Sequence, residues 1–180
     1  MRVRYRLGLM KILLLSLFLA LPLGAQRGPR PAAPLAIHMA DGSTTQLSSY
    51  KGKVVVLALL NTGCSHCQHF AQQLAMYQRE YGPKGVQVVA AVFDKEAKQE
   101  LGNFKSKYVQ GFPVGYSDEA TVMKWLGQAP EDGYFVPIVA FINRAGVIES
   151  QHFGDDALFQ DPDGSIRHKL DLMLKRPVGK

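Results

Sequence analysis

The 180-residue chain has little charge, no internal repeat and only two cysteines. Charged residues make up 20% of it and hydrophobic residues 47%, which is an ordinary globular composition and disfavours intrinsic disorder. The length fits one domain with a short appendage.

Excess positive charge is also missing from the main part of the chain. The net charge is +6, but residues 1–30 hold six basic side chains and no acid, while residues 31–180 hold 15 basic and 15 acidic side chains. A nucleic-acid-binding protein concentrates positive charge on its folded surface, because phosphate neutralisation supplies much of its affinity. The distribution therefore predicts no nucleic-acid partner.

The basic residues near the start precede an uncharged apolar run at residues 12–21. A positive start, a short apolar run and small residues up to Ala25 are the parts of a secretory signal peptide, predicted here over residues 1–25. The alternative is that the same segment stays uncleaved as a membrane anchor. In both cases we expect a periplasmic or other extracytoplasmic domain, preceded by a Pro-rich tether over residues 26–34.

Hydrophobic patterns over residues 35–180 predict one α/β domain. Residues 54–60 form an apolar run typical of a central strand, and apolar residues then recur at helical spacing over residues 67–81. A second apolar strand follows at residues 86–93. These segments predict a β-α-β unit with parallel strands.

The remaining elements complete a mixed sheet with helices on both faces. We expect an N-terminal β-hairpin extension and a central αβ insertion. The predicted segments are a hairpin over 36–47, a helix over 95–108, an extended piece at 112–116, a helix over 119–126, antiparallel strands at 138–142 and 147–153, and a helix over 165–174.

Both cysteines lie in one motif, Cys64-Ser65-His66-Cys67, between the apolar strand and the amphipathic helix. A C-x-x-C beside a β-α-β pattern is typical of a redox site. Cys64 lies at the helix N-terminus, where free N–H groups and the helix dipole stabilise a thiolate. We therefore expect Cys64 to attack and Cys67, one turn later, to resolve the mixed disulfide.

Other uses of the cysteines are less consistent with the sequence. A structural disulfide closing so short a loop would contribute little stability. Cys64, His66, Cys67 and His69 cannot all face one metal ion from the start of a helix, and no second ligand pair exists elsewhere. Haem attachment would need a histidine where Gln68 stands. We expect neither a metal nor a cofactor.

Residues 47–67 and the later Val136-Pro137 resemble the TlpA/ResA-type thiol-disulfide oxidoreductases, and the resemblance extends over about residues 35–175. It implies a thioredoxin-like fold. It also implies that Pro137 follows a cis peptide bond and lies against the active-site sulfurs, and that the backbone of Val136 pairs with a bound client.

The same resemblance implies the partners. The clients would be exported proteins that contain cysteine, with cytochrome c maturation as one setting. A membrane thiol reductase of the DsbD/CcdA kind would supply electrons, and the chain would be tethered to the membrane if the leader is retained.

Three positions depart from the pattern of the family. Gly63 stands where a tryptophan commonly precedes the first cysteine, so access to the site is expected to be more open. Ala58 stands where thioredoxin has a buried acid, and Phe70 stands where ResA-type proteins have a glutamate. Proton transfer is therefore expected to depend on water, on His66 or on a partner.

Ser65 and His66 are expected to tune the redox properties of the pair. A histidine that donates a hydrogen bond to the Cys64 sulfur would favour the thiolate and make the disulfide more oxidising. This motif resembles the oxidant DsbA, whereas the rest of the chain resembles reductants. The sequence leaves the direction open.

Two further functions compete with disulfide exchange. A peroxiredoxin-like peroxidase would have a threonine where Asn61 stands, three residues before the first cysteine, and a proline upstream. A copper chaperone would bind metal through Cys64, Cys67 and a remote histidine such as His152, although such chaperones usually have three residues between their cysteines. Protein-disulfide exchange remains the leading hypothesis.

Overall fold

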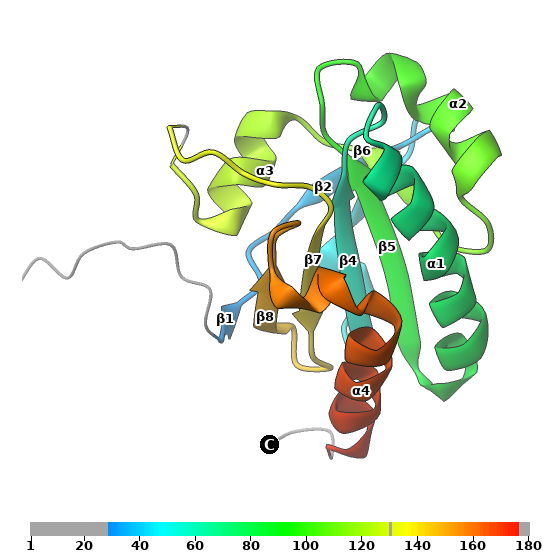
Figure 1. Cartoon of the computed structure of the whole chain (residues 1–180), viewed down its shortest axis with the longest axis vertical. Coiled ribbons are helices and arrows are strands. Elements are labelled where there is room, and N and C mark those ends of the chain that lie inside the picture. The colour runs from blue at the N-terminus through cyan, green and yellow to red at the C-terminus, as the bar shows by residue number, and fades with distance from the viewer. Residues whose placement is uncertain (1–28, 130, 177–180) are drawn as a thin grey trace, which may run out of the picture.

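Eight strands form one sheet in the computed structural model, which describes residues 29–129 and 131–176 (Figure 1). The predicted signal peptide and residues 26–28 of the predicted tether lie outside the described residues. In spatial order the strands are β1 (Arg30–Pro31), β8 (Val147–His152), β7 (Ile138–Ile142), β4 (Val54–Leu60), β5 (Val86–Val92), β6 (Val114–Tyr116), β2 (Ala36–Met39) and β3 (Thr44–Gln46).

The centre of the sheet is the parallel pair β4 and β5. Their register runs from Val54 opposite Val86 to Leu60 opposite Val92. All seven residues of β4 are buried, as the continuous apolar run predicts for a strand covered on both faces. The predicted β-α-β unit is confirmed.

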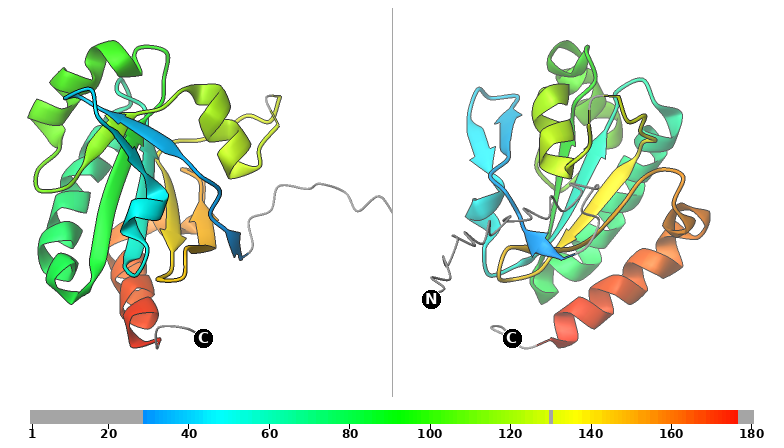
Figure 2. Two further views of the ribbon diagram at one scale, coloured as in Figure 1. Left: turned by 180° about the vertical axis from the view of Figure 1, so that it is seen from behind. Right: turned by 90° about the vertical axis from the view of Figure 1, so that its left-hand side faces the viewer.

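Helices cover both faces of the sheet, as predicted (Figure 2). On one face α1 (Ser65–Tyr81), α2 (Ala97–Tyr108) and α4 (Pro162–Lys175) pack against the even-numbered side chains of β4. On the other face α3 (Glu119–Leu126) packs with the odd-numbered ones. Three short 3₁₀ helices complete the fold: η1 (Leu47–Tyr50), η2 (Gly82–Lys84) and η3 (Ala157–Gln160). Within the described ranges, no helix has the length and apolar character needed to cross a bilayer.

Antiparallel pairs extend the sheet on both sides. Strands β7 and β8 form the predicted hairpin, with Ala140 opposite Gln151. Strands β2 and β3 pair about a turn at Gly42, which has a φ of +84° that favours glycine. Strand β2 also pairs with β6, so this hairpin continues the main sheet beyond β6.

The second half of the predicted tether is part of the folded structure. Arg30 lies in β1 beside β8, and its guanidinium donates to the carbonyl of Trp125 at 3.0 Å and to Oε1 of Gln151 at 2.8 Å. The Trp125 indole N–H donates in turn to the carbonyl of Ala33 at 2.9 Å. The folded domain therefore begins before the boundary expected between residues 34 and 35. The sequence did not predict this strand, because a short Pro-rich edge strand has no periodic hydrophobic pattern.

Arg30→Ala should lower the free energy of unfolding by about 1–2 kcal/mol, because it removes two hydrogen bonds from a charged donor. Urea unfolding followed by circular dichroism measures the change. Arg79→Ala, at an exposed position of α1, is the matched control and should alter stability little. Equal stability of the two variants would show that Arg30 does not anchor the segment.

Candidate functional site: the two cysteines and the cleft beside them

The site lies where β4 ends and α1 begins. Cys64 is the N-cap of α1, with an extended backbone (φ −87°, ψ 116°), and its sulfur accepts the backbone N–H of Cys67 at 3.2 Å. Ser and Asp side chains usually accept this N-cap hydrogen bond, and here a thiol accepts it. The N–H donor and the positive end of the helix dipole both favour negative charge on the Cys64 sulfur.

The two thiols have different surroundings. Cys64 is half-buried and lines an open cleft, whereas Cys67 has no exposed surface. Burial is the main cause that raises the pKa of the Cys67 thiol; Cys64 and the charge of Asp94 raise it further, while a hydrogen bond from the Asn61 backbone opposes them. The accessible sulfur is therefore suited to attack, and the buried one is held as a thiol.

Ser65 and His66 occupy the first turn of α1, and both side chains are exposed. Among the described residues, the group that reaches the Cys64 sulfur is the Cys67 backbone N–H, and no hydrogen bond joins the His66 ring to that sulfur. Redox tuning by these two residues remains a prediction.

A carboxylate that the sequence analysis missed lies beside the pair. Asp94 lies two residues after the end of β5, and its two carboxylate oxygens accept from the Thr62 backbone N–H at 2.7 Å and from the Thr62 hydroxyl at 2.6 Å. These bonds hold the turn before Cys64. Because β4 and β5 are parallel, their ends share one edge of the sheet, so the position of Asp94 after the second strand was a usable signal.

The two positions where related proteins carry an acid are apolar, as the sequence shows. Ala58 is buried in the middle of β4, and Phe70 packs edge-on against Phe159 with ring centres 5.4 Å apart. The charge of Asp94, which lies after β5, is the smallest of the effects that raise the pKa of the Cys67 thiol.

A cleft of about 760 Å³ opens beside Cys64, between the start of α1 and α2. Its lining is mainly polar: Asn61, Thr62, Gly63, Cys64, Gln68, Asp94, Glu96, Glu100, Asn103, Phe104, Lys107 and Tyr108. At Gly63 a Cβ would meet no atom within 4 Å. The approach to Cys64 is therefore open at the position where the family has tryptophan.

The Val136–Pro137 peptide bond is cis, as the resemblance implied. Ile138 pairs with Leu59 near the end of β4, so Pro137 lies at the sheet edge from which the chain turns toward Cys64. Val136 is half-buried. Position 154 requires glycine, because a Cβ at Gly154 would lie 2.7 Å from the carbonyl oxygen of Val136. Pairing of Val136 with a client remains a prediction.

The ligands suggested for a copper chaperone are not brought together. Among residues 29–129 and 131–176, no group of three His, Cys, Asp or Glu side chains is arranged to hold a metal ion. His152 instead lies 3.2 Å from a carboxylate oxygen of Asp156, and its ring packs edge-on against Phe141.

Comparison with known proteins agrees with this geometry. ResA of Bacillus thuringiensis subsp. konkukian, a thiol-disulfide oxidoreductase, is 29% identical over 115 residues, which are 64% of this chain and 63% of the relative, so the match spans less than two thirds of that protein. A Chlorobium tepidum protein assigned as the thiol:disulfide interchange protein DsbE has a TM-score of 0.67 at 23% identity and covers 82% of this chain and 99% of its own.

A second Chlorobium tepidum structure, a thiol:disulfide interchange protein of the thioredoxin family, has a TM-score of 0.63 at 18% identity and covers 79% of this chain and 97% of its own. These structures confirm the thioredoxin-like fold. The family model described as Redoxin matches residues 28–163, and the chain belongs to the Redoxin family.

Proposed function

We propose that this protein is a thiol-disulfide oxidoreductase that exchanges a Cys64–Cys67 disulfide or dithiol with cysteines of exported proteins. The observation that carries the proposal is the asymmetry of the pair: an N-cap thiol open to a cleft and a fully buried thiol one turn later. The similarity to ResA supports the same activity.

Exchange then proceeds in two steps. The Cys64 thiolate attacks one sulfur of a client disulfide, forming a mixed disulfide and releasing the other client sulfur as a thiolate, which takes up a proton. Cys67 loses its proton and attacks the Cys64 sulfur. This step forms the Cys64–Cys67 disulfide and releases the second client sulfur, so two electrons have passed to the client. The reverse sequence oxidises a client dithiol.

The second step needs a base, because Cys67 is buried and held as a thiol. Asp94 lines the cleft, and within the described ranges its carboxylate accepts two hydrogen bonds, both from Thr62, so the carboxylate oxygens retain lone pairs for a water molecule. We assign Asp94 the acceptance of the Cys67 proton through water in the cleft. In this proposal the proton of Cys67 is transferred without His66.

The client is expected to lie along the edge that carries the cis proline. In this proposal the backbone of Val136 pairs with the client, and the neighbouring Phe135, 63% exposed, offers an apolar contact to an extended chain. Apocytochrome c is one candidate client, and a DsbD/CcdA-type reductase is the proposed electron donor. The composition of residues 1–25 supports a periplasmic or membrane-tethered location.

The reducing direction is favoured over the oxidising one. A DsbA-like oxidant would need extra stabilisation of the Cys64 thiolate, and the exposed His66 ring forms no hydrogen bond to that sulfur in the described structure. The resemblance of the chain to TlpA/ResA-type reductants favours the same direction.

Cys64→Ser should abolish reduction of a disulfide-bonded peptide, because it removes the attacking sulfur. Cys67→Ser should react once and then accumulate a Cys64–peptide mixed disulfide, visible as an added peptide mass in mass spectrometry. His69→Ala, at an exposed position of α1, is the matched control and should retain turnover. Full turnover by either cysteine variant contradicts the proposed roles.

Asp94→Asn should slow the resolution step about tenfold near neutral pH, because a positioned base contributes at least that much to proton transfer. Asparagine can still accept from Thr62, so the turn is kept. Stopped-flow release of a fluorescent peptide should show the rate rising only at higher pH, with the rate of Cys64 attack unchanged.

Glu96→Gln changes a carboxylate in the same cleft and should leave both rates and the pH profile unaltered. An unchanged pH profile for Asp94→Asn would remove Asp94 from the proton path while leaving the cysteine assignments intact.

A further inference from the structure

The end of the molecule opposite the cysteines is basic. Three turns and the end of α4 meet there. The contacts that join them are Gly52 N–H to the Arg144 carbonyl at 2.9 Å, Val54 N–H to the Gly85 carbonyl at 3.0 Å, and the Arg144 guanidinium to the Arg176 carbonyl at 2.9 Å. We call this surface the basic end; its positive side chains are Lys51, Lys53, Lys84, Arg144, Lys175 and Arg176.

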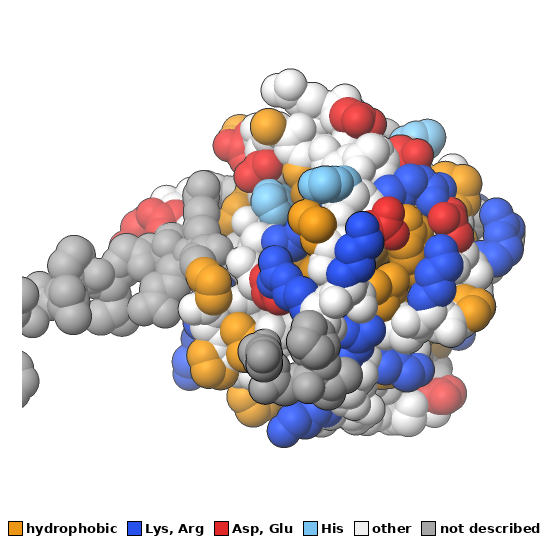
Figure 3. All heavy atoms as spheres, turned by 90° about the horizontal axis from the view of Figure 1, so that it is seen from below, with side chains coloured by type: hydrophobic (Ala, Val, Ile, Leu, Met, Phe, Trp, Pro, Cys, Tyr) orange, Lys and Arg blue, Asp and Glu red, His pale blue; other side chains and the backbone are white. Residues whose placement is uncertain are grey.

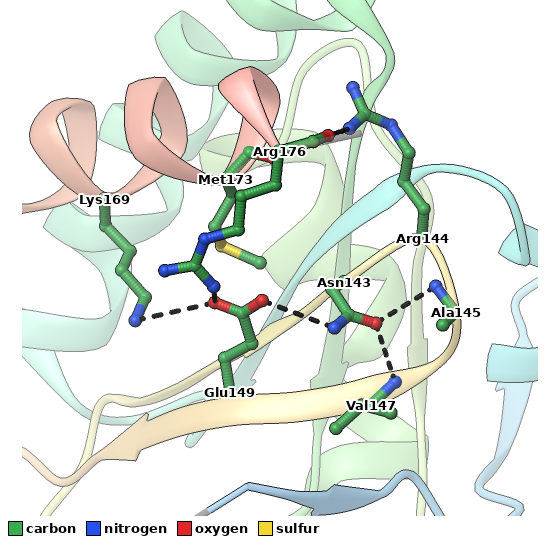
Figure 4. Close-up of polar contacts among 8 residues, drawn as sticks. All are labelled: Asn143, Arg144, Ala145, Val147, Glu149, Lys169, Met173 and Arg176. Atoms are coloured by element: carbon green, nitrogen blue, oxygen red, sulfur yellow. Dashed lines mark hydrogen bonds and ion pairs between the residues drawn. The ribbon is translucent and has the colours of Figure 1, made fainter. Parts of the chain in front are cut away.

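Few acids lie among these six side chains, although exposed Asp171 precedes Lys175 by one turn of α4 and exposed Glu80 lies near the end of α1. Glu149 is the one acid near them in residues 143–149, and residues 48–54, 82–87 and 173–176 contain none. The Glu149 side chain is only 10% exposed. Its Oε2 lies 2.7 Å from a guanidinium nitrogen of Arg176 and 4.0 Å from Nζ of Lys169 (Figure 4). Lys and Arg side chains gather on the face seen from this end (Figure 3).

The cleft at the other end of the molecule is lined by more acidic than basic side chains. Asp94, Glu96 and Glu100 line the cleft beside Cys64, with Lys107 as the one basic side chain in that lining. The lining of the cleft beside Cys64 is therefore acidic, although Lys95, Lys98 and Lys105 are exposed on or just before α2 at the same end of the molecule.

The first strand of the fold and the last described residue also lie at the basic end. Pro31 pairs with Val147, and the N–H of Ala32 donates to the carbonyl of Gly146 at 2.9 Å, in the turn that carries Arg144. The described residues end at Arg176, which belongs to the same surface. The apolar run predicted as a signal peptide or anchor thus precedes a segment that joins the fold here.

We propose that the basic end binds a lipid bilayer surface that carries anionic headgroups, with the cysteine pair facing away from the membrane. Clustered Lys and Arg side chains are attracted to such a surface within a Debye length, about 10 Å at 0.1 M salt. Exposed lysines supply this contact without a folded pocket, because their long side chains reach the headgroups. The proposal concerns orientation and does not depend on the redox activity.

The test is a lysine footprint of the full chain. The protein is reconstituted in vesicles of phosphatidylcholine alone or mixed with phosphatidylglycerol, treated briefly with an amine-acylating reagent, and analysed by mass spectrometry. Labelling of the basic-end lysines should fall about fivefold on the anionic vesicles only, and high salt should restore it. The exposed lysines of the α2 region, Lys95, Lys98 and Lys105, should label equally in all conditions.

Two variants complete the test. K51E/K53E/K84E should lose the protection of Lys175, whereas K95E/K98E/K105E, with the same change of charge at exposed positions, should keep it. Equal labelling of the two ends, equal protection on neutral vesicles, or protection by duplex DNA but not by anionic vesicles would each overturn the proposal. Because the leader is present in every sample, its insertion alone would protect the basic end equally on neutral and on anionic vesicles.

Discussion

The parallel pairing of β4 with β5 is the constraint on which the rest of the structure depends. Parallel strands end at the same edge of a sheet, so the residues that follow them, Cys64 and Asp94, come together. The residues that precede them, Lys53 and Lys84, come together at the opposite edge. The antiparallel strand β7 reverses this order and places Pro137 at the edge of the sheet from which the chain turns toward Cys64, and Arg144 at the basic end. One register thus determines both the reactive end and the basic end.

Within the reactive end, chemistry depends on a difference between two identical side chains. A helix begins at Cys64, so that sulfur receives an N–H and the favourable end of the dipole. One turn later the helix faces the core, so Cys67 loses its contact with solvent and is held as a thiol. The carboxylate of Asp94 lines the cleft beside Cys64, and in the proposed function it accepts the Cys67 proton through water.

The sequence predicted the parts of this arrangement whose signals are local. Strand β4 is a continuous apolar run, α1 shows helical spacing, and the pair Cys64 and Cys67 lies between them, so fold and attacking residue followed together. Pro137 was found through family resemblance, and its cis bond agrees. Asp94 was missed because family resemblance places the acid at Ala58 or Phe70, within ten residues of the cysteines, whereas Asp94 follows the next strand of the sheet.

Arg30 and the basic end were missed for a different reason. The Arg30 anchor depends on the carbonyl of Trp125 and the amide of Gln151, which are far away in sequence and carry no pattern that points to an N-terminal strand. The basic end was not predicted because equal numbers of acids and bases in residues 31–180 say nothing about their separation in space. Only the topology of the sheet reveals that separation.

The central claim is that Cys64 and Cys67 interconvert between dithiol and disulfide as one two-electron pair. Equilibrium titration of the protein in defined redox buffers, with trapping of free thiols and mass spectrometry, tests it directly. The account predicts a single two-electron transition between the two cysteines of one chain, with a midpoint closer to that of thioredoxin, about −270 mV, than to that of DsbA, about −120 mV. Failure to form an intramolecular disulfide, or oxidation of Cys64 while Cys67 stays a free thiol, would contradict it.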